Sequence, residues 1–435
     1  MAIPKNVTSI GDRAFYRCTS LTAIDVAALN PVYGSFEGVL FNKSQTTLIL
    51  CPPDKTGAYT IPGSVTTIGD EAFLSCTGLT SIVIPNGVTS IGDGAFADCR
   101  SLTSLTIGNR VTSIGPYVFS GCSGLTHVTI PDSVRSIGDW AFADCTSLTS
   151  VTIPDSVFSI GEQAFRFCAS LTSVTIGNSV TRIGQAAFQF CTSLTSVTIP
   201  DSVTRIGDWA FRGCGRLARL TIPDSVIHLD GGAFSECTSL ISIVIPDSVT
   251  IIGSEAFSGC SGLTNVVIGN GVNTIGYCAF RGCAGLTSVS IPESVTNIQR
   301  GAFHGLSSLT AIGVHAANPA YCSPEGVLLS KAQDRVMQYP QGRVGSYVIL
   351  ASVTTIDAEA FSGCRWLTGV VIPGSVTSID YAVFSGCSCL TNVVIGNGVT
   401  NIGVDAFSGC IGLTSLTIPD GVTSIESGAF STAPI

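Results

Sequence analysis

The stretch from Leu148 to Ser170, LTSVTIPDSVFSIGEQAFRFCAS, decides the fold of this chain because nearly all of the remaining sequence repeats it. The Phe of its Ala-Phe pair recurs every 23 residues from Phe73 to Phe303, and again from Phe361 to Phe430. A unit of this size is too small to bury its own apolar face, so successive units must stack and bury that face together. The sequence therefore predicts a repeat solenoid.

The pattern inside one unit predicts the path of each coil. Counted from Leu148, apolar residues occupy unit positions 1, 4, 6, 10, 13, 17, 18 and 21. Alternation from Val151 to Ile153 predicts a short strand, Pro154-Asp155-Ser156 predicts a turn, and residues 157–160 form a second extended piece. After Gly161 the apolar spacing changes to three and four, which predicts a short helix. A leading Leu and a period of about 20 to 29 residues are typical of leucine-rich repeats.

The predicted architecture is thus a leucine-rich-repeat array of about sixteen β-strand/turn/short-helix coils, elongated and curved. We expect a single solenoid over residues 1–435. The residues expected to form its structural core occupy unit positions 18 and 21: Phe96, Phe119, Phe142, Phe165, Phe188, Phe211, Cys145, Cys168 and Cys191.

Two long units interrupt the period, at about residues 21–78 and 309–366. They match each other, since Asn30-Pro31-Val32-Tyr33 corresponds to Asn318-Pro319-Ala320-Tyr321 and Glu37-Gly38-Val39-Leu40 to Glu325-Gly326-Val327-Leu328. In each, two apolar runs flank a polar turn, which predicts a β-hairpin projecting from one coil.

Composition narrows the classes of function. Charged residues make up only 11% of the chain, and the net charge of −9 comes without a basic tract, which argues against nucleic acid as a partner. No apolar run is long enough to span a bilayer, so we expect no membrane insertion. Because Met1 leads directly into the middle of a coil, we expect a trimmed chain without its targeting segment. The pattern leaves the oligomeric state open.

The 18 cysteines favour buried thiols over a disulfide framework. Fourteen of them occupy unit position 21, where one coil has Leu306 instead, so the position is interpreted as a small apolar site in the core. A few disulfides along this ladder remain an alternative. No Cys-x-x-Cys pair with zinc spacing is present.

At this point the resemblance to a known family is specific. The phrase LTSVTIPDSVTRIGDWAF (residues 194–211) and the long-unit phrases EGVLFNK, TLILCPP and YTIPGSVTTIG resemble the BspA-like leucine-rich-repeat family of surface antigens. The resemblance covers essentially the whole chain. It implies extracellular display and binding of host matrix proteins, host cells or other microbes, and it brings no catalytic residues.

No catalytic constellation, cofactor site or metal site is predicted. The four histidines are scattered and lie outside any nucleophile or metal motif. Stacked carboxylates at unit position 8, such as Asp132, Asp155 and Asp201, suit calcium or ordinary turn chemistry. Calcium therefore stays open as an alternative.

A row of threonines offers a second alternative. Unit position 5 is Thr in six successive coils from Thr106 to Thr221. Such a hydroxyl row on a flat solenoid suits ice binding, whereas a solvated strand face with good β-propensity is the simpler interpretation.

A cluster of basic and aromatic residues is the best candidate for a binding surface, since Arg and Trp often anchor interfaces. Its members occupy several unit positions: Arg182, Arg205, His228, Arg212, Arg216, Arg219, Tyr117, Trp140 and Trp209. We expect a non-catalytic adhesion scaffold at the cell surface or secreted, with a protein or glycan ligand. The alternatives are an ice-binding or structural surface and an intracellular, cytoplasmic protein-interaction scaffold.

Overall fold

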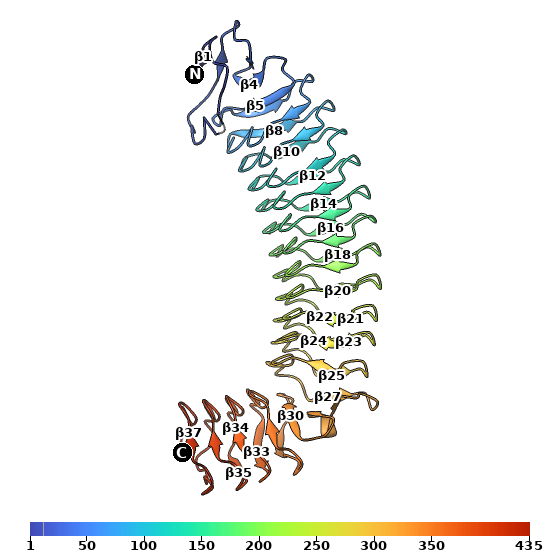
Figure 1. Cartoon of the computed structure of the whole chain (residues 1–435), viewed down its shortest axis with the longest axis vertical. Coiled ribbons are helices and arrows are strands. Elements are labelled where there is room, and N and C mark those ends of the chain that lie inside the picture. The colour runs from blue at the N-terminus through green and yellow to red at the C-terminus, as the bar shows by residue number, and fades with distance from the viewer. Residues whose placement is uncertain (12) are drawn as a thin grey trace. The chain divides into compact units, whose positions relative to one another are not determined.

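The computed structural model describes residues 1–11 and 13–435. It contains two compact units, Met1–Val226 (unit 1) and Ile227–Ile435 (unit 2), and each is a stack of coils (Figure 1). The described residues form about 18 turns, rather than sixteen, because each long unit contributes an extra turn. The single-solenoid organisation over residues 1–435 stays a prediction.

Unit 1 stacks two series of parallel strands. The first series follows the Leu of each coil and comprises β6 (Gly57–Thr60), β8 (Leu79–Val83), β10 (Ser104–Thr106), β12 (His127–Thr129), β14 (Ser150–Thr152), β16 (Ser173–Thr175) and β18 (Ser196–Thr198). The second series comprises β7 (Thr67–Ile68), β9 (Ser90–Ile91), β11 (Ser113–Ile114), β13 (Ser136–Ile137), β15 (Ser159–Ile160), β17 (Arg182–Ile183) and β19 (Arg205–Ile206). Val151 pairs in register with Val174, so equivalent residues of neighbouring coils lie directly over one another.

Unit 2 repeats this arrangement. Its first series comprises β21 (Ser242–Ile245), β23 (Asn265–Ile268), β25 (Ser288–Ile291), β27 (Ala311–Val314), β31 (Gly345–Val348), β33 (Leu367–Ile372) and β35 (Asn392–Ile395). Its second series comprises β20 (His228–Leu229), β22 (Ile251–Ile252), β24 (Thr274–Ile275), β26 (Asn297–Ile298), β32 (Thr355–Ile356), β34 (Ser378–Ile379), β36 (Asn401–Ile402) and β37 (Ser424–Ile425).

The predicted short helix is wrong. Among the described residues the only helix is the 3-10 turn η1 (Pro324–Gly326), so none is long and apolar enough to cross a membrane. Unit positions 14 to 21 instead form successive four-residue turns. For example, the Arg166 N–H donates to Gln163 O, and the Cys168 N–H donates to Phe165 O. Gln163 and Phe167 adopt positive φ, which interrupts a helix and turns alternate N–H groups toward the next coil.

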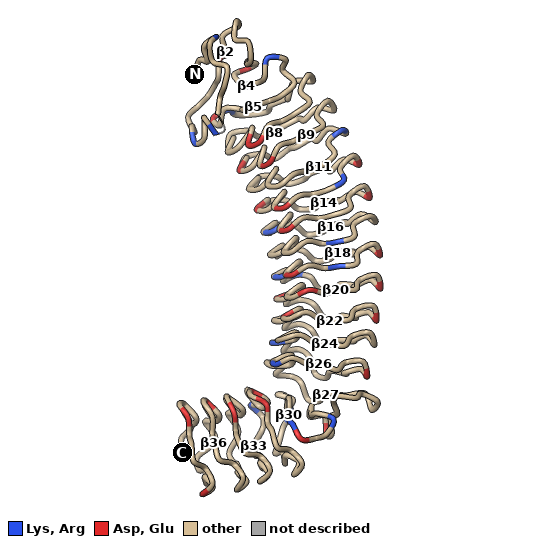
Figure 2. Tube along the Cα trace, in the orientation of Figure 1, with Lys and Arg blue, Asp and Glu red and all other residues tan. Residues whose placement is uncertain are grey.

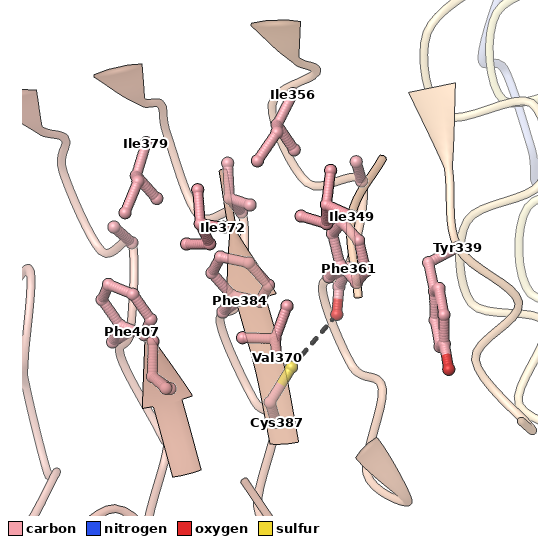
Figure 3. Packing of buried hydrophobic residues seen from close by; sticks show 14 of the residues in the cluster. Tyr339, Ile349, Ile356, Phe361, Val370, Ile372, Ile379, Phe384, Cys387 and Phe407 are labelled. Carbon is pink, nitrogen blue, oxygen red and sulfur yellow. Dashed lines mark hydrogen bonds between the residues drawn. The ribbon is translucent and has the colours of Figure 1, made fainter. Parts of the chain in front are cut away.

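A stack of phenylalanines forms the centre of each core. Phe165 is fully buried, and its ring centroid lies 5.2 Å from that of Phe142 and 5.3 Å from that of Phe188, with nearly parallel planes. Offset stacking at this distance is favourable for aromatic rings. Figure 3 shows the same packing in unit 2, where Phe361, Phe384 and Phe407 follow one another among aliphatic side chains.

The cysteine ladder has a role that the sequence did not reveal. The Cys168 thiol donates a hydrogen bond to the carbonyl oxygen of Phe142 at 3.2 Å, and Cys387 makes the same bond to Phe361 (Figure 3). All 18 cysteines are free thiols. Cys18 is exposed, contrary to the ladder prediction.

We expect thiol reagents to modify the two exposed cysteines, Cys18 and Cys389, quickly and the buried ladder slowly. Burial raises the pKa of Cys214 to about 12, so at pH 8 only about one such thiol in ten thousand is the reactive thiolate. Mass spectrometry after timed alkylation of native protein measures this. Fast alkylation of Cys214 in folded protein would contradict the structure.

Both long units contain the predicted hairpin, but the hairpin does not project. In unit 1, β3 (Tyr33–Phe36), β4 (Val39–Asn42) and β5 (Thr47–Leu50) are antiparallel, and in unit 2 so are β28 (Tyr321–Cys322), β29 (Leu328–Ser330) and β30 (Arg335–Gln338). The last strand of each hairpin pairs in parallel with the second strand series, β5 with β7 and β30 with β32. The hairpin is therefore integrated, and its apolar residues Val39 to Phe41 are buried. The short strands β1 (Ala2–Ile3) and β2 (Asp25–Val26) pair before the first hairpin.

A buried asparagine fastens each long unit to the coil before it. The Asn318 side-chain amide donates to the carbonyls of Pro292 at 2.8 Å and Val295 at 2.9 Å. Its oxygen accepts from the N–H groups of Ala320 and Tyr321. Asn30 makes the four equivalent bonds in unit 1, so the asparagine is a structural feature of both long units.

Candidate functional site

Three residues of the predicted binding cluster lie on one side of unit 1, together with three that the sequence reasoning missed. The turns at unit positions 16 to 20 place these six residues on five successive coils. We call this surface the aromatic–arginine ridge: Tyr117, Trp140, Arg166, Phe167, Phe190 and Arg212.

Ring stacking and cation–π contacts make the ridge continuous. The rings of Tyr117 and Trp140 stack with centroids 5.9 Å apart, and the Arg166 guanidinium lies 5.4 Å from the centroid of Trp140. The same guanidinium lies 4.5 Å from the Phe167 ring. Cation–π contacts at such distances are favourable and hold the guanidinium in place.

The far end of the ridge continues in the same way. The Phe167 ring stacks on Phe190 at 5.1 Å, and the Arg212 guanidinium lies 5.8 Å from the Phe190 centroid. Gln163 holds Arg166 through a 2.7 Å hydrogen bond from Nη1. Burial raises the pKa of the neighbouring Asp144 carboxyl, while Arg166 acts in the opposite direction.

The ridge aromatics occupy strained backbone positions. Tyr117, Trp140, Phe167 and Phe190 all have φ near +58°. For residues other than Gly this conformation costs roughly 1–3 kcal/mol each. Glycine fills the same turn positions in other coils of unit 1, at Gly94, Gly121 and Gly213, so the aromatic residues are not required by the turn.

The other residues of the predicted cluster lie elsewhere. Arg182 and Arg205 pair in register on β17 and β19 and are exposed there. Arg219 forms an isolated bridge with Ser196 beside the first strand series, and Arg216 is exposed at the end of its coil.

Two further members of the predicted cluster do not join the ridge. Trp209 is 38% exposed at the same turn position as Trp140, but Gln163 and Ala186 occupy that position in the two coils between them. His228 begins unit 2 on β20 and is exposed.

The two polar rows of the sequence are present in unit 1. Thr129, Thr152 and Thr175 stand opposite one another in register and are exposed. Acidic residues recur at corresponding corners of successive coils (Figure 2). Asp155 there accepts the backbone N–H of Asn178 in the next coil at 2.7 Å, which gives this carboxylate a structural role. Among the described residues, no three His, Cys, Asp or Glu side chains gather closely enough to hold a metal ion.

Stacked in-register coils with a leading Leu, two short parallel strands and a Phe-centred core define a leucine-rich-repeat solenoid. Proteins of this class are repeat scaffolds and are generally not enzymes. The model of the BspA type leucine rich repeat region matches the chain in six copies, over residues 1–123, 51–168, 112–241, 158–283, 232–318 and 341–435. The chain belongs to this family.

Solved structures of bacterial leucine-rich-repeat proteins are similar to this chain. One from Bacteroides ovatus is 29% identical, with a TM-score of 0.63 and coverage of 88% of this chain and 91% of its own. A leucine rich cell surface protein from Faecalibacterium prausnitzii is 26% identical, with a TM-score of 0.49 and coverage of 93% and 87%. No curated protein matches the chain.

Proposed function

We propose that this protein is a non-catalytic adhesion scaffold of the cell surface that binds a protein or glycan through the aromatic–arginine ridge. Membership of the BspA type family supports surface display, and the continuous ridge is the observation that supports this site. Aromatic rings and guanidinium groups are frequent anchors of interfaces. Arginine also donates bidentate hydrogen bonds to carboxylates.

The turn conformation of the ridge allows its aromatic side chains to be removed cleanly. An aromatic residue at positive φ is less stable than the glycine that other coils use there. Because glycine fits these turns, the aromatic side chains can be removed without disrupting the coil.

The proposal is tested by replacing the ridge while keeping the fold. We expect a Trp140→Gly/Phe167→Gly/Arg212→Ser variant to bind at least tenfold more weakly than the parent to the protein or glycan found on an array of matrix proteins and glycans. Biolayer interferometry measures the affinities, and circular dichroism checks the fold. The Phe158→Ala variant is the matched control, because Phe158 is an aromatic side chain of unit 1 that is 51% exposed outside the ridge.

A second variant separates the ridge from the remaining basic residues. Arg182, Arg205 and Arg219 stay candidates for binding, and an Arg182/Arg205/Arg219→Ser variant removes all three. We expect it to lose less affinity than the ridge variant, because its guanidinium groups are dispersed over the two strand series. An unchanged affinity in the ridge variant would refute the ridge as the binding site.

A further inference from the structure

In a regular coil, alternate N–H groups of the turn bind the next coil. Cys278, Phe280 and Gly282 donate to the carbonyls of Arg300, Ala302 and His304 at 3.2, 2.9 and 2.9 Å. Equivalent hydrogen bonds between neighbouring regular coils recur along both units. Each coil thus presents a row of donors that the next coil satisfies with alternate carbonyls of its own main chain.

The long units break this row. In unit 2 the hairpin takes the place of the preceding coil as the donor to the coil of Phe361. The Tyr339 N–H donates to Ala360 O at 2.8 Å. Within the described part of the chain, the N–H groups of Gly301 and Phe303 consequently have no acceptor. In unit 1 Cys51 N–H likewise donates to Ala72 O at 2.7 Å, and Phe15 N–H has no acceptor among residues 1–11 and 13–435.

A cleft opens at each interrupted row. In unit 2 it has a volume of about 530 Å³, and Gly301 and Phe303 line it together with Ile298 and Glu359. Ile298 is only partly buried, whereas its counterpart Ile275 in the preceding coil is fully buried. The hairpin therefore uncovers both backbone donors and apolar surface.

The cleft in unit 1 uses equivalent positions of the other long unit. Its volume is about 890 Å³, and Ile10, Phe15 and Glu71 line it where Ile298, Phe303 and Glu359 line the first. Both volumes fall in the usual range of ligand pockets. An Arg–Glu ion pair bridges each cleft, Arg13 with Glu71 in unit 1 and Arg300 with Glu359 in unit 2. Such exposed pairs are weak, so a ligand can displace them.

The unpaired donors indicate what kind of molecule fits. Elsewhere in both units their partners are alternate carbonyls of a main-chain turn, so the spacing of the row already matches a peptide backbone in that turn conformation. Unpaired backbone groups readily add another chain segment through main-chain hydrogen bonds. The buried Nδ1 atom of His304, which has no partner in the described part, adds another polar contact to the cleft of unit 2.

The charged residues that line the clefts indicate which side chains would suit a peptide bound there. The described lining of the unit 2 cleft includes three carboxylates and two guanidinium groups: Asp357, Glu359, Asp380, Arg300 and Arg335. The described lining of the unit 1 cleft includes four carboxylates and two guanidinium groups: Asp70, Glu71, Asp93, Asp98, Arg13 and Arg17. Lysine or arginine side chains therefore complement both clefts.

We propose that each long unit forms a binding cleft for a basic peptide segment of a partner protein, whose main-chain carbonyls accept from the open N–H row. The proposal is separate from the ridge, since it concerns other residues and would survive failure of the ridge variants.

The probe is a phage-displayed library of random dodecapeptides, selected on the full chain. We expect basic peptides to be enriched and to bind with two sites per chain by calorimetry. Glu71→Arg and Glu359→Arg should each remove one site, because each replaces a carboxylate of one cleft by a guanidinium group that repels a basic peptide. Glu255→Arg is the matched control, since Glu255 occupies the same positive-φ turn position in a regular coil of unit 2.

Amide exchange tests the backbone contact directly. In the free protein the Phe303 and Phe15 amides should exchange with solvent at least a hundredfold faster than the Phe280 amide, and the selected peptide should slow them at least tenfold. Enrichment of no basic peptide, equal loss of binding in the Glu255→Arg control, or unchanged exchange of both amides on binding would each overturn the proposal.

Discussion

Replacing Phe165 by alanine is expected to destabilise unit 1 by about 3–5 kcal/mol, the usual cost of truncating a buried phenylalanine. The ring is fully buried and packs between two parallel rings, so the cavity has little freedom to collapse. Because contacts in a solenoid run only between neighbouring coils, the loss should appear first as local opening around residues 142–188. Urea unfolding followed by circular dichroism measures the free energy, and hydrogen exchange locates the opening.

The Phe158→Ala variant again provides the control. Phe158 belongs to the same coil, but its side chain is 51% exposed, so the change in stability should stay within about 0.5 kcal/mol. Equal stability of Phe165→Ala and the parent would contradict the coil assignment of the whole array.

The Asn318→Ala variant is expected to lose about 3–6 kcal/mol. Asn318 is completely buried, and its removal leaves the Val295 carbonyl and the N–H groups of Ala320 and Tyr321 without partners. The Pro292 carbonyl then keeps only its 3.4 Å bond from the Val295 N–H. Each unsatisfied buried group costs about 1–3 kcal/mol, and a water molecule can replace only part of the network. Thermal and urea unfolding of unit 2 measure the loss.

Two comparisons sharpen this result. Asn30→Ala removes the same four bonds in unit 1 and should be destabilising by a similar amount. Asn270→Ala changes an exposed asparagine of unit 2 and should be nearly neutral. If Asn318→Ala were as mild as Asn270→Ala, the asparagine would not fasten the long unit.

Much of the fold could be predicted from the sequence because stacking repeats one interaction many times. The Phe at unit position 18 and the alternation from Val151 to Ile153 identify the buried positions directly. The turn at positions 14 to 21 was mistaken for a helix because successive turns also bring residues three and four apart to one face. Positive φ at Gln163 or Phe167 could not be predicted from residue type, since Gly, Glu, Gln and Trp all occupy these positions.

The candidate site was less predictable than the fold. Tyr117, Trp140 and Arg212 were identified by residue type, whereas Phe167 and Phe190 resemble any other apolar repeat residue. Their place in the ridge depends on the positive-φ turn, which aims unit positions 16 and 20 toward the same surface. The open N–H rows depend on which strand the hairpin pairs with, and that register is a property of the folded chain.

The alternate donors and acceptors of the turns give every regular coil two different surfaces that complement each other. A coil can therefore be followed by any other regular coil, because the junction is always the same. Misaligned recombination between copies of the gene should then add or remove whole repeats without creating a new interface. The array can therefore change length in evolution by whole coils. Each long unit is an exception, because its hairpin interrupts the hydrogen bonds between regular coils.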